Sequence, residues 1–182
     1  MSQKYFTLII PFSHTNDQVL LGLKKRGTGT GLWNGFGGKL EKGESIDECA
    51  VRELREESGV AAVDMTYVGV LYMNCTDGVG DTVIFVYKCK CGGTIVESDE
   101  MRPEWFGVDG IPYSEMYEEA VLWWPVLLDN EDPRFVASFM FDGDDLISHE
   151  IKRGDKDNAE VSNLLADAQS EATTAAAATD AG

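Results

Sequence analysis

The sequence predicts a mixed α/β fold of the α+β kind, in which a β-sheet is combined with at least one well-defined helix. Several runs are rich in aromatic and β-branched residues, as strands are. One segment, Ile46–Ser58, carries both a helix start signal and a helix stop signal. The 182 residues are 43% hydrophobic, which is enough for the core of one domain.

The first strands are expected at Lys4–Phe12 and Gln18–Arg26, on either side of the polar turn SHTND. The segment that follows, Gly27–Lys39, has the wrong length for a helix and too much glycine for a strand. Its glycines at positions 35, 37 and 38 would let the backbone approach a phosphate or a metal closely. We therefore expect a binding loop here.

The helix at Ile46–Ser58 is predicted from its two ends. Ser45 and Glu48 have the spacing of a capping box, in which the serine accepts from the helix backbone and the glutamate reaches back. Gly59 is a natural helix stop.

The second half of the chain again alternates strands and turns. We expect two strands joined by the turn TDGVG, a strand–acidic loop–strand segment, a mixed helical and loop region interrupted by Pro125, and a hairpin around Asp142–Asp145. In order, these segments are Thr66–Cys75, Asp81–Cys91, Gly93–Pro112, Tyr113–Leu128 and Arg134–Lys152.

The composition changes near residue 153, so we expect a domain over residues 1–153 and a tail over residues 154–182. The tail is rich in Ala, Thr, Asp and Glu and has no aromatic residue. Such a segment is predicted to be disordered, with a transient helix over Asn158–Gln169.

Charge and cysteine usage narrow the function classes. The formal net charge of −17 argues against affinity for nucleic-acid backbone, although a bound cation would still allow a small anionic partner. The sequence contains no run of 18 apolar residues, so we expect no membrane span. Its N-terminus lacks the features of a signal peptide or a transit peptide. Four cysteines without CxxC spacing argue against a zinc site and favour reduced thiols, so we expect a cytoplasmic protein, with nucleus and mitochondrion left open.

The acidic side chains of the predicted helix are the strongest functional signal. At about 100° per residue, Glu53, Glu56 and Glu57 fall on or beside the apolar stripe formed by Ile46, Cys49, Ala50 and Leu54. Carboxylates about 6 Å apart repel by roughly 3 kcal/mol at an effective dielectric near 20. A divalent cation removes this penalty, and oxygen ligands suit Mg²⁺ or Mn²⁺. Arg52 is placed to orient one carboxylate through a charge-assisted hydrogen bond.

These residues also form a longer pattern, G-x5-E-x7-R-E-L-x-E-E-x-G-V, which resembles a complete Nudix box. It runs from Gly38 through Glu44, Arg52, Glu53, Leu54, Glu56, Glu57 and Gly59 to Val60. The resemblance implies Mg²⁺-dependent hydrolysis of nucleoside diphosphates linked to another moiety. It also implies the Nudix fold, a mixed β-sheet sandwiched between helices with the box as loop–helix–loop.

The flanking motifs LLGLKKRGTGTGLWNGFGGKLEKGE and TIVESDEMRPEWF are similar to the MutT-homologue branch, the oxidised-purine nucleoside triphosphatases. The similarity covers about Lys4 to Ile151 and leaves out the tail. It implies metal ligands at the Gly37 carbonyl, Glu53, Glu56, Glu57 and Glu100. The catalytic set is then Glu53, Glu56, Glu57, Arg52 and Glu100.

The same resemblance implies a set of substrate contacts. Lys24 would meet the triphosphate, Asn34 would bond the base edge, and Trp123 would stack on the base or pack in the core. The full set is Thr7, Lys24, Asn34, Phe36, Gly37, Gly38, Lys39, Tyr117, Glu118, Glu119 and Trp123.

The chain departs from this branch at the base pocket. Tyr117 stands where the branch has Trp, and Glu118, Glu119 and Ala120 stand where it has Pro and two aspartates. Bulkier pocket residues are also usual at the positions of Thr28, Met73 and Gly80. The departure leaves the hydrolytic box complete but puts the preferred base in question.

From the sequence we expect a monomeric, Mg²⁺-dependent enzyme. It would convert oxidised purine nucleoside triphosphates to monophosphate and pyrophosphate and so sanitise the nucleotide pool. Its partners would be small nucleotides, with no nucleic acid and no membrane. A box glutamate or Glu100 would accept the proton from the attacking water. Two alternatives stay open: a Nudix diphosphatase of other specificity, which includes methylated or ordinary nucleotides and dinucleotides, and a nucleotide-binding module without turnover.

Overall fold

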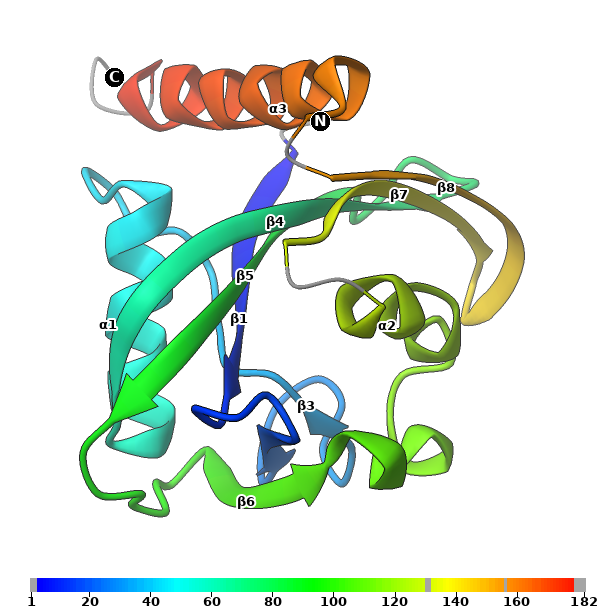
Figure 1. Cartoon of the computed structure of the whole chain (residues 1–182). Helices are drawn as coiled ribbons and strands as arrows, with labels where there is room; N and C mark the ends of the chain where they lie inside the picture. The colour runs from blue at the N-terminus through cyan, green and yellow to red at the C-terminus, as the bar shows by residue number, and fades with distance from the viewer. Residues whose placement is uncertain (1–2, 130–131, 156, 179–182) are drawn as a thin grey trace.

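The computed structural model describes residues 3–129, 132–155 and 157–178. In this range a curved sheet lies between helices, with α1 and α3 outside its curve and α2 inside it (Figure 1). The elements are β1 (Lys4–Phe12), β2 (Gln18–Lys24), β3 (Trp33–Asn34), α1 (Ile46–Ser58), β4 (Ala61–Cys75), β5 (Thr82–Gly92), β6 (Met101–Gly107), α2 (Ala120–Leu128), β7 (Arg134–Asp142), β8 (Asp145–Gly154) and α3 (Ala159–Ala178), with short 3-10 turns at Val108–Gly110 and Tyr113–Glu115.

The strands form one mixed sheet in the order β3-β2-β1-β5-β4-β7-β8. The remaining strand, β6, also pairs with β2 but lies outside this linear order. The pairs β1–β5 and β4–β7 are parallel, and the other pairs are antiparallel. The mixed α+β class predicted from the sequence is therefore confirmed.

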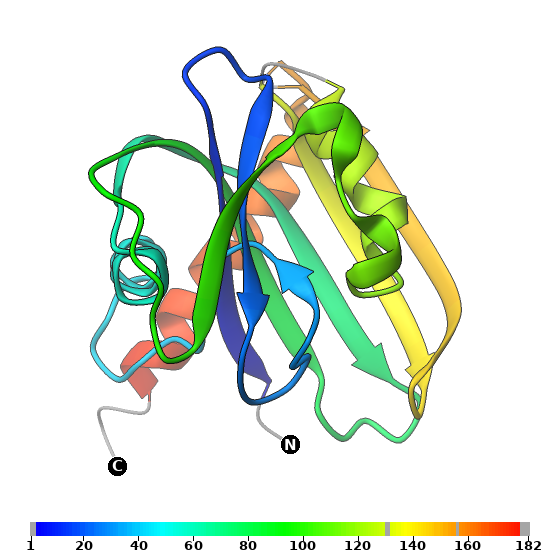
Figure 2. The same ribbon diagram turned by 90° about the horizontal axis from the view of Figure 1, so that it is seen from below.

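Each face of the sheet carries its own apolar core, because strand side chains alternate between the two faces. α2 covers one core and α1 and α3 cover the other, as the view from below also shows (Figure 2). On β1 the two cores take alternate residues: Leu8, Ile10 and Phe12 face α2, whereas Ile9 faces α1.

The helix predicted at Ile46–Ser58 is confirmed as α1. Ser45 and Glu48 form the expected capping box, and Gly59 ends the helix with a left-handed φ of 75°. Both ends are held by local hydrogen bonds, which explains why the sequence alone located them.

Several boundaries differ from the sequence prediction. β2 ends at Lys24 instead of Arg26. β4 begins at Ala61 instead of Thr66, and its pairing with β5 contains two register shifts. Pro125 lies inside α2 and does not interrupt it. The hairpin around Asp142–Asp145 is confirmed, with β7 ending and β8 beginning at these residues.

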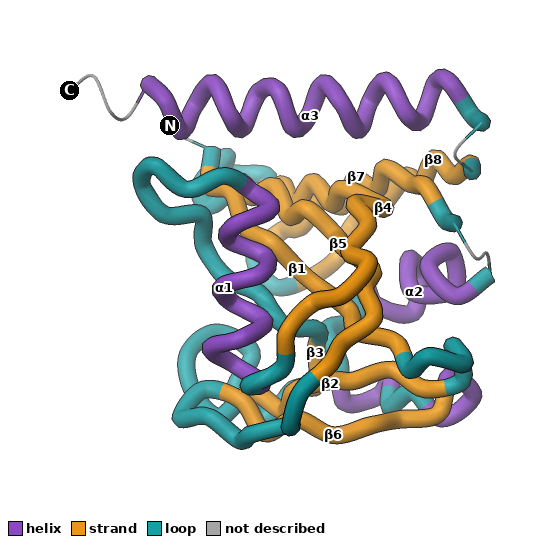
Figure 3. The backbone as a smooth tube through the Cα atoms, turned by 60° about the vertical axis from the view of Figure 1, so that its left-hand side comes forward, coloured by secondary structure: helices purple, strands orange, loops and turns teal. Residues whose placement is uncertain are grey.

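The predicted disordered tail is instead largely helical. α3 lies across the sheet beyond β4 and β7 (Figure 3). It buries one stripe of side chains against the core shared with α1, namely Val161, Leu165, Ala168 and Ala172. Their spacing of four, three and four residues is that of an amphipathic helix. Composition did not reveal this pattern, because two of the four buried residues of the stripe are small alanines. Among the described residues, no helix is long and apolar enough to cross a membrane.

Candidate functional site

The glycine-rich loop is held against the first strand by main-chain hydrogen bonds. The Thr7 amide donates to the Gly38 carbonyl at 3.0 Å, and the Ile9 amide donates to the Phe36 carbonyl at 2.7 Å. Gly37 has a φ of 154°, and a Cβ there would lie 2.0 Å from the Thr7 carbonyl oxygen. A larger residue at this position would push the loop off β1, so the glycine is required for the close approach.

The box glutamates, Glu53, Glu56 and Glu57, lie on α1 in three different environments. Glu57 is 3% exposed, and its Oε2 accepts a hydrogen bond from the Gly37 amide at 2.8 Å. The Glu53 side chain is 16% exposed, whereas that of Glu56 is 61% exposed. A Cβ on Gly38 would lie 2.3 Å from Glu53 Oε1, so this carboxylate also abuts the loop. The helix places two of the three carboxylates directly beneath the glycine loop.

Arg52 connects these carboxylates to the loop that precedes the helix. Its Nε and Nη2 donate to the two carboxylate oxygens of Glu44 at 2.7 and 2.9 Å. Its Nη1 donates to Glu53 at 2.7 Å and to Glu56 at 3.2 Å. The two-pronged contact with Glu44 fixes the guanidinium plane, and the guanidinium in turn orients Glu53. Glu44 was part of the sequence motif, but its anchoring role was not predicted.

The electrostatics of the loop–helix contact favour added positive charge. Burial, with smaller contributions from the charges of Glu53 and Glu100, raises the pKa of Glu57 to about 7, although the Gly37 amide and Lys24 oppose the shift. Burial also raises the pKa of Glu53, against the stabilising contact with Arg52. Carboxylates that are both buried and crowded carry an energetic cost that a nearby cation removes.

The donor chemistry therefore fits a hard divalent cation, because carboxylate and carbonyl oxygens are its preferred ligands. The side chains do not converge on one point: in residues 3–129, 132–155 and 157–178, no group of three His, Cys, Asp or Glu side chains is arranged to hold a metal. Glu56 turns towards Arg52, and Glu100 pairs with Arg26.

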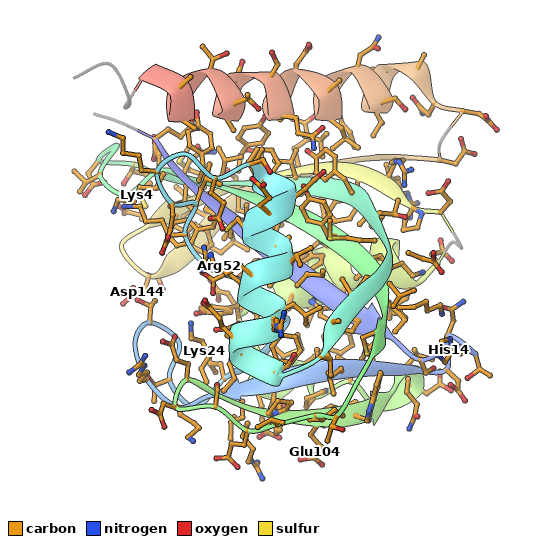
Figure 4. All side chains as sticks on the ribbon, turned by 90° about the vertical axis from the view of Figure 1, so that its left-hand side faces the viewer. Lys4, His14, Lys24, Arg52, Glu104 and Asp144 are labelled. Carbon is orange, nitrogen blue, oxygen red and sulfur yellow. The ribbon has the colours of Figure 1, made fainter. Side chains whose placement is uncertain are left out.

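A central cavity of about 660 Å³ opens beside the glycine loop and runs between the sheet and α2. Most of the predicted substrate contacts line it, namely Thr7, Lys24, Asn34, Gly37, Gly38, Tyr117, Glu118, Glu119 and Trp123. Figure 4 shows Lys24, Arg52 and Asp144 on one side of α1, with His14 on the opposite side. The glycine loop and the inner cavity therefore form one continuous opening.

Two predicted contacts do not line the central cavity. Phe36 is fully buried in the core shared with α1 and α3, which also contains Ile9 and Leu20, and its backbone is bridged to Ile9 of β1. Lys39 is exposed, and its carbonyl accepts from Arg52. Thr28 and Met73 do line the cavity, whereas Gly80 lies in the β4–β5 turn with open space around it.

The inner end of the central cavity carries one buried acid. Glu119 is 8% exposed, and burial raises the pKa of its carboxyl group. Its neighbour Glu118 accepts from the Leu146 amide at 3.0 Å and so ties the segment before α2 to β8. The Tyr117 hydroxyl donates to the Thr28 carbonyl at 3.3 Å, across the cavity wall. Of the three acids that line the cavity, Glu119 is therefore the buried one, whereas Glu118 and Asp144 are exposed.

Two polar side chains of the cavity-lining residues have partners within the protein. Asn34 Oδ1 accepts from the Gly35 amide at 2.9 Å. The Thr7 hydroxyl lies 3.4 Å from Cys49 Sγ, on the α1 side of β1, so Thr7 contributes to the cavity mainly through its backbone. Cys49 also lies 3.8 Å from the Gly38 carbonyl, and burial raises the pKa of its thiol to about 11. This neutral thiol supports the loop from below, a role that sequence reasoning did not predict.

The comparisons with known proteins agree with this geometry. Residues 7–124 match the model of the NUDIX domain. The chain is 42% identical over 134 residues to the oxidized purine nucleoside triphosphate hydrolase of Danio rerio. The aligned region covers 71% of this chain and 83% of that protein. The chain is 36% identical over 156 residues to the Mus musculus protein of the same name, covering 85% and 97%. A MutT protein structure from Bacillus halodurans superposes with a TM-score of 0.72 at 28% identity, covering 82% of this chain and 97% of that one.

Proposed function

Because the chain belongs to the Nudix family, we propose that it hydrolyses oxidised purine nucleoside triphosphates to the monophosphate and pyrophosphate. The observation that carries the proposal is the continuity of the site. The central cavity is lined both by the buried acid Glu119 and by Gly37 and Gly38 of the glycine loop, and the box glutamate Glu57 accepts a hydrogen bond from the Gly37 amide of that loop. A purine base and its polyphosphate need such an arrangement, with a base pocket and a phosphate site in one opening.

In this proposal the base occupies the inner end of the cavity, between Tyr117, Glu119 and Trp123. Glu119 shares or accepts a proton at the base edge, which its raised pKa favours. Asn34 adds its amide group to the same pocket, and Lys24 at the cavity wall attracts the triphosphate.

The box glutamates Glu53, Glu56 and Glu57, together with Glu100 and the Gly37 carbonyl, would hold Mg²⁺, with Mn²⁺ as a substitute. When bound, the cation supplies charge neutralisation for the polyphosphate and makes a water molecule more acidic. Arg52 keeps Glu53 oriented towards the loop, and the close packing of Gly37 and Gly38 keeps the backbone near the phosphates. A box glutamate or Glu100 accepts the proton from the attacking water.

We also propose that the protein works as a monomer in the cytoplasm. Its four cysteines are free thiols, as expected in a reducing compartment.

Ala120 favours a second candidate, a Nudix diphosphatase with a different base preference. It lines the cavity where the resembling branch carries a second acid, so one group able to read an altered base is missing. The two candidates are separated by kcat/KM for 8-oxo-dGTP, 2-hydroxy-dATP, dGTP, ADP-ribose and diadenosine polyphosphates. The first candidate requires a damaged purine triphosphate to be the best substrate. A better rate with any other member of the panel would favour the second.

Turnover itself is tested with Glu57→Gln, which keeps the size of the side chain but removes its charge. We expect kcat to fall by about a hundredfold or more at saturating Mg²⁺, because the charge that holds the cation is lost. Glu41→Gln, which removes one negative charge at an exposed position in the loop before the same helix, serves as the matched control. Near-normal pyrophosphate release by a folded Glu57→Gln variant would contradict the proposed role of the box.

A further inference from the structure

Arg26 and Glu100 form an ion pair at the edge of the phosphate end of the site. Arg26 follows β2, and Glu100 precedes β6, which pairs antiparallel to β2 with Lys24 opposite Met101. The Lys25 amide donates to the Glu100 carbonyl at 2.8 Å. The two backbones are therefore held together by the sheet, while the side chains project from its end.

Glu100 lies close to the box helix, because the next residue, Met101, is buried in the same core as Ala50 and Leu54 of α1. In keeping with this position, the charge of Glu100 raises the pKa of both Glu53 and Glu57. The Glu100 carboxylate, however, forms its hydrogen bond and ion pair with Arg26, and both side chains are exposed. An exposed ion pair is weak, so the carboxylate can leave it at low cost.

We propose that Arg26 is a latch that competes with the divalent cation for the Glu100 carboxylate. The inference rests on the proposed function, in which Glu100 is one of the metal ligands. In the latched arrangement Glu100 is turned to Arg26, as in this structure. In the unlatched arrangement Glu100 joins the box glutamates and the guanidinium is released. Arg26 is thus a positioning residue that sets the metal affinity of the free enzyme.

Lys25 provides a matched control. It lies on the same loop and also pairs with the acidic loop, through a 2.7 Å contact with Glu97 and a 2.7 Å bond to the Ser98 carbonyl. Its partner Glu97, unlike Glu100, is not one of the proposed metal ligands. Removing the charge of Lys25 therefore changes the electrostatic potential at the proposed metal site in a similar way but leaves the Glu100 carboxylate paired with Arg26.

The test is an equilibrium titration of the nucleotide-free, full-length protein with Mn²⁺, followed by electron paramagnetic resonance of the free ion. Because the latch is an exposed ion pair, Arg26→Gln should tighten Mn²⁺ binding by about twofold to fivefold. Lys25→Gln should change the Kd clearly less. Glu100→Gln should weaken binding, and Arg26→Gln should bring no tightening when it is added to Glu100→Gln.

The outcomes separate the latch from the proposed function. If Glu100→Gln weakens Mn²⁺ binding but Arg26→Gln weakens it too, or acts only as Lys25→Gln does, the latch is wrong and the ligand role of Glu100 stands. If Glu100→Gln leaves the Kd unchanged, both the ligand role of Glu100 and the latch are wrong. Circular dichroism of each variant checks that the exposed substitutions leave the fold intact.

Discussion

Glu119 and Ala120 are neighbours in the chain, and both line the central cavity, yet only one of them can accept or share a proton. A buried hydrogen bond to a charged group contributes about 1.5–3 kcal/mol, which corresponds to roughly a tenfold to hundredfold change in kcat/KM. Ala120→Asp should raise the preference for 8-oxo-dGTP or 2-hydroxy-dATP over dGTP by a factor in this range, as measured from the kcat/KM values of both proteins.

The matched control is Val121→Asp, which adds the same charge one position along α2 at an exposed site. It should leave the preference unchanged. An Ala120→Asp protein that folds but shows the preference of the unmodified protein would contradict the assignment of this end of the cavity to the base.

Burial of Glu119 also predicts a pH dependence of stability. The folded protein raises the pKa of this carboxyl group above its ordinary value of 4.5. A raised pKa means that its contribution to stability is fully present below the unfolded pKa and is lost as the pH rises through the folded pKa. Glu119→Gln should therefore match the unmodified protein in Tm near pH 4 and exceed it near pH 7.

The exposed Glu115→Gln removes the same charge in the turn before α2 and serves as the control. It should show no such gain in Tm between the two pH values. A Glu119→Gln protein whose Tm advantage stays flat or shrinks with rising pH would show that Glu119 is not held at a raised pKa by burial.

At the scale of elements, α3 is expected to be part of the folded domain. Val161 and Leu165 are almost fully buried against the core shared with α1, and the Tyr67 hydroxyl donates to the Leu165 carbonyl at 3.4 Å. Burying a large apolar side chain contributes about 1.5–3 kcal/mol, and about 1 kcal/mol shifts the Tm of a domain of this size by roughly 2–4 °C. Leu165→Asp should thus lower the Tm by at least about 5 °C in a thermal melt.

Ala166→Asp places the same acid on the exposed face of the helix and should leave the Tm nearly unchanged. Equal melting temperatures for Leu165→Asp and Ala166→Asp would mean that α3 does not dock on the sheet.

The elements that the sequence located are those with local signals. Ser45, Glu48 and Gly59 fix the ends of α1 by hydrogen bonds within a few residues, so a sequence pattern was sufficient. The inward turn of Phe36 depends on the pairing of the glycine loop with β1, which is not local. The docking of α3 depends likewise on a tyrosine-lined sheet face about a hundred residues earlier in the chain. Such contacts between distant segments cannot be read from composition.

Within the site, too, features set by local sequence were predicted, whereas contacts between distant segments were not. The placement of Glu53 and Glu57 beside the apolar stripe followed from helix periodicity, and the structure buries Glu57 most deeply. Periodicity gave no indication that Glu44 would anchor Arg52 from outside the helix, or that Arg26 would pair with Glu100 across two strands. These contacts arise where separate elements meet, so they required the three-dimensional arrangement.

At the scale of the whole molecule, the sheet separates two functions. The face towards α2 forms the central cavity, and the face towards α1 and α3 forms the core that supports the box helix. The glycine loop contacts both sides, because Gly37 and Gly38 line the central cavity and also lie against Glu57 and Glu53 of α1. In the proposed function, the base pocket and the phosphate site therefore meet at one short segment of backbone.

The most direct test of this account is a competition between 8-oxo-dGTP and dGTP in one reaction, with products separated by chromatography, in the presence of Mg²⁺ or of excess EDTA. The account predicts that 8-oxo-dGMP and pyrophosphate form first with Mg²⁺ and that neither nucleotide is cleaved with EDTA. Equal consumption of the two nucleotides, or faster loss of dGTP, would contradict the proposed role in removing oxidised purine triphosphates. Cleavage that continues in EDTA would contradict the metal-dependent chemistry assigned to the box glutamates.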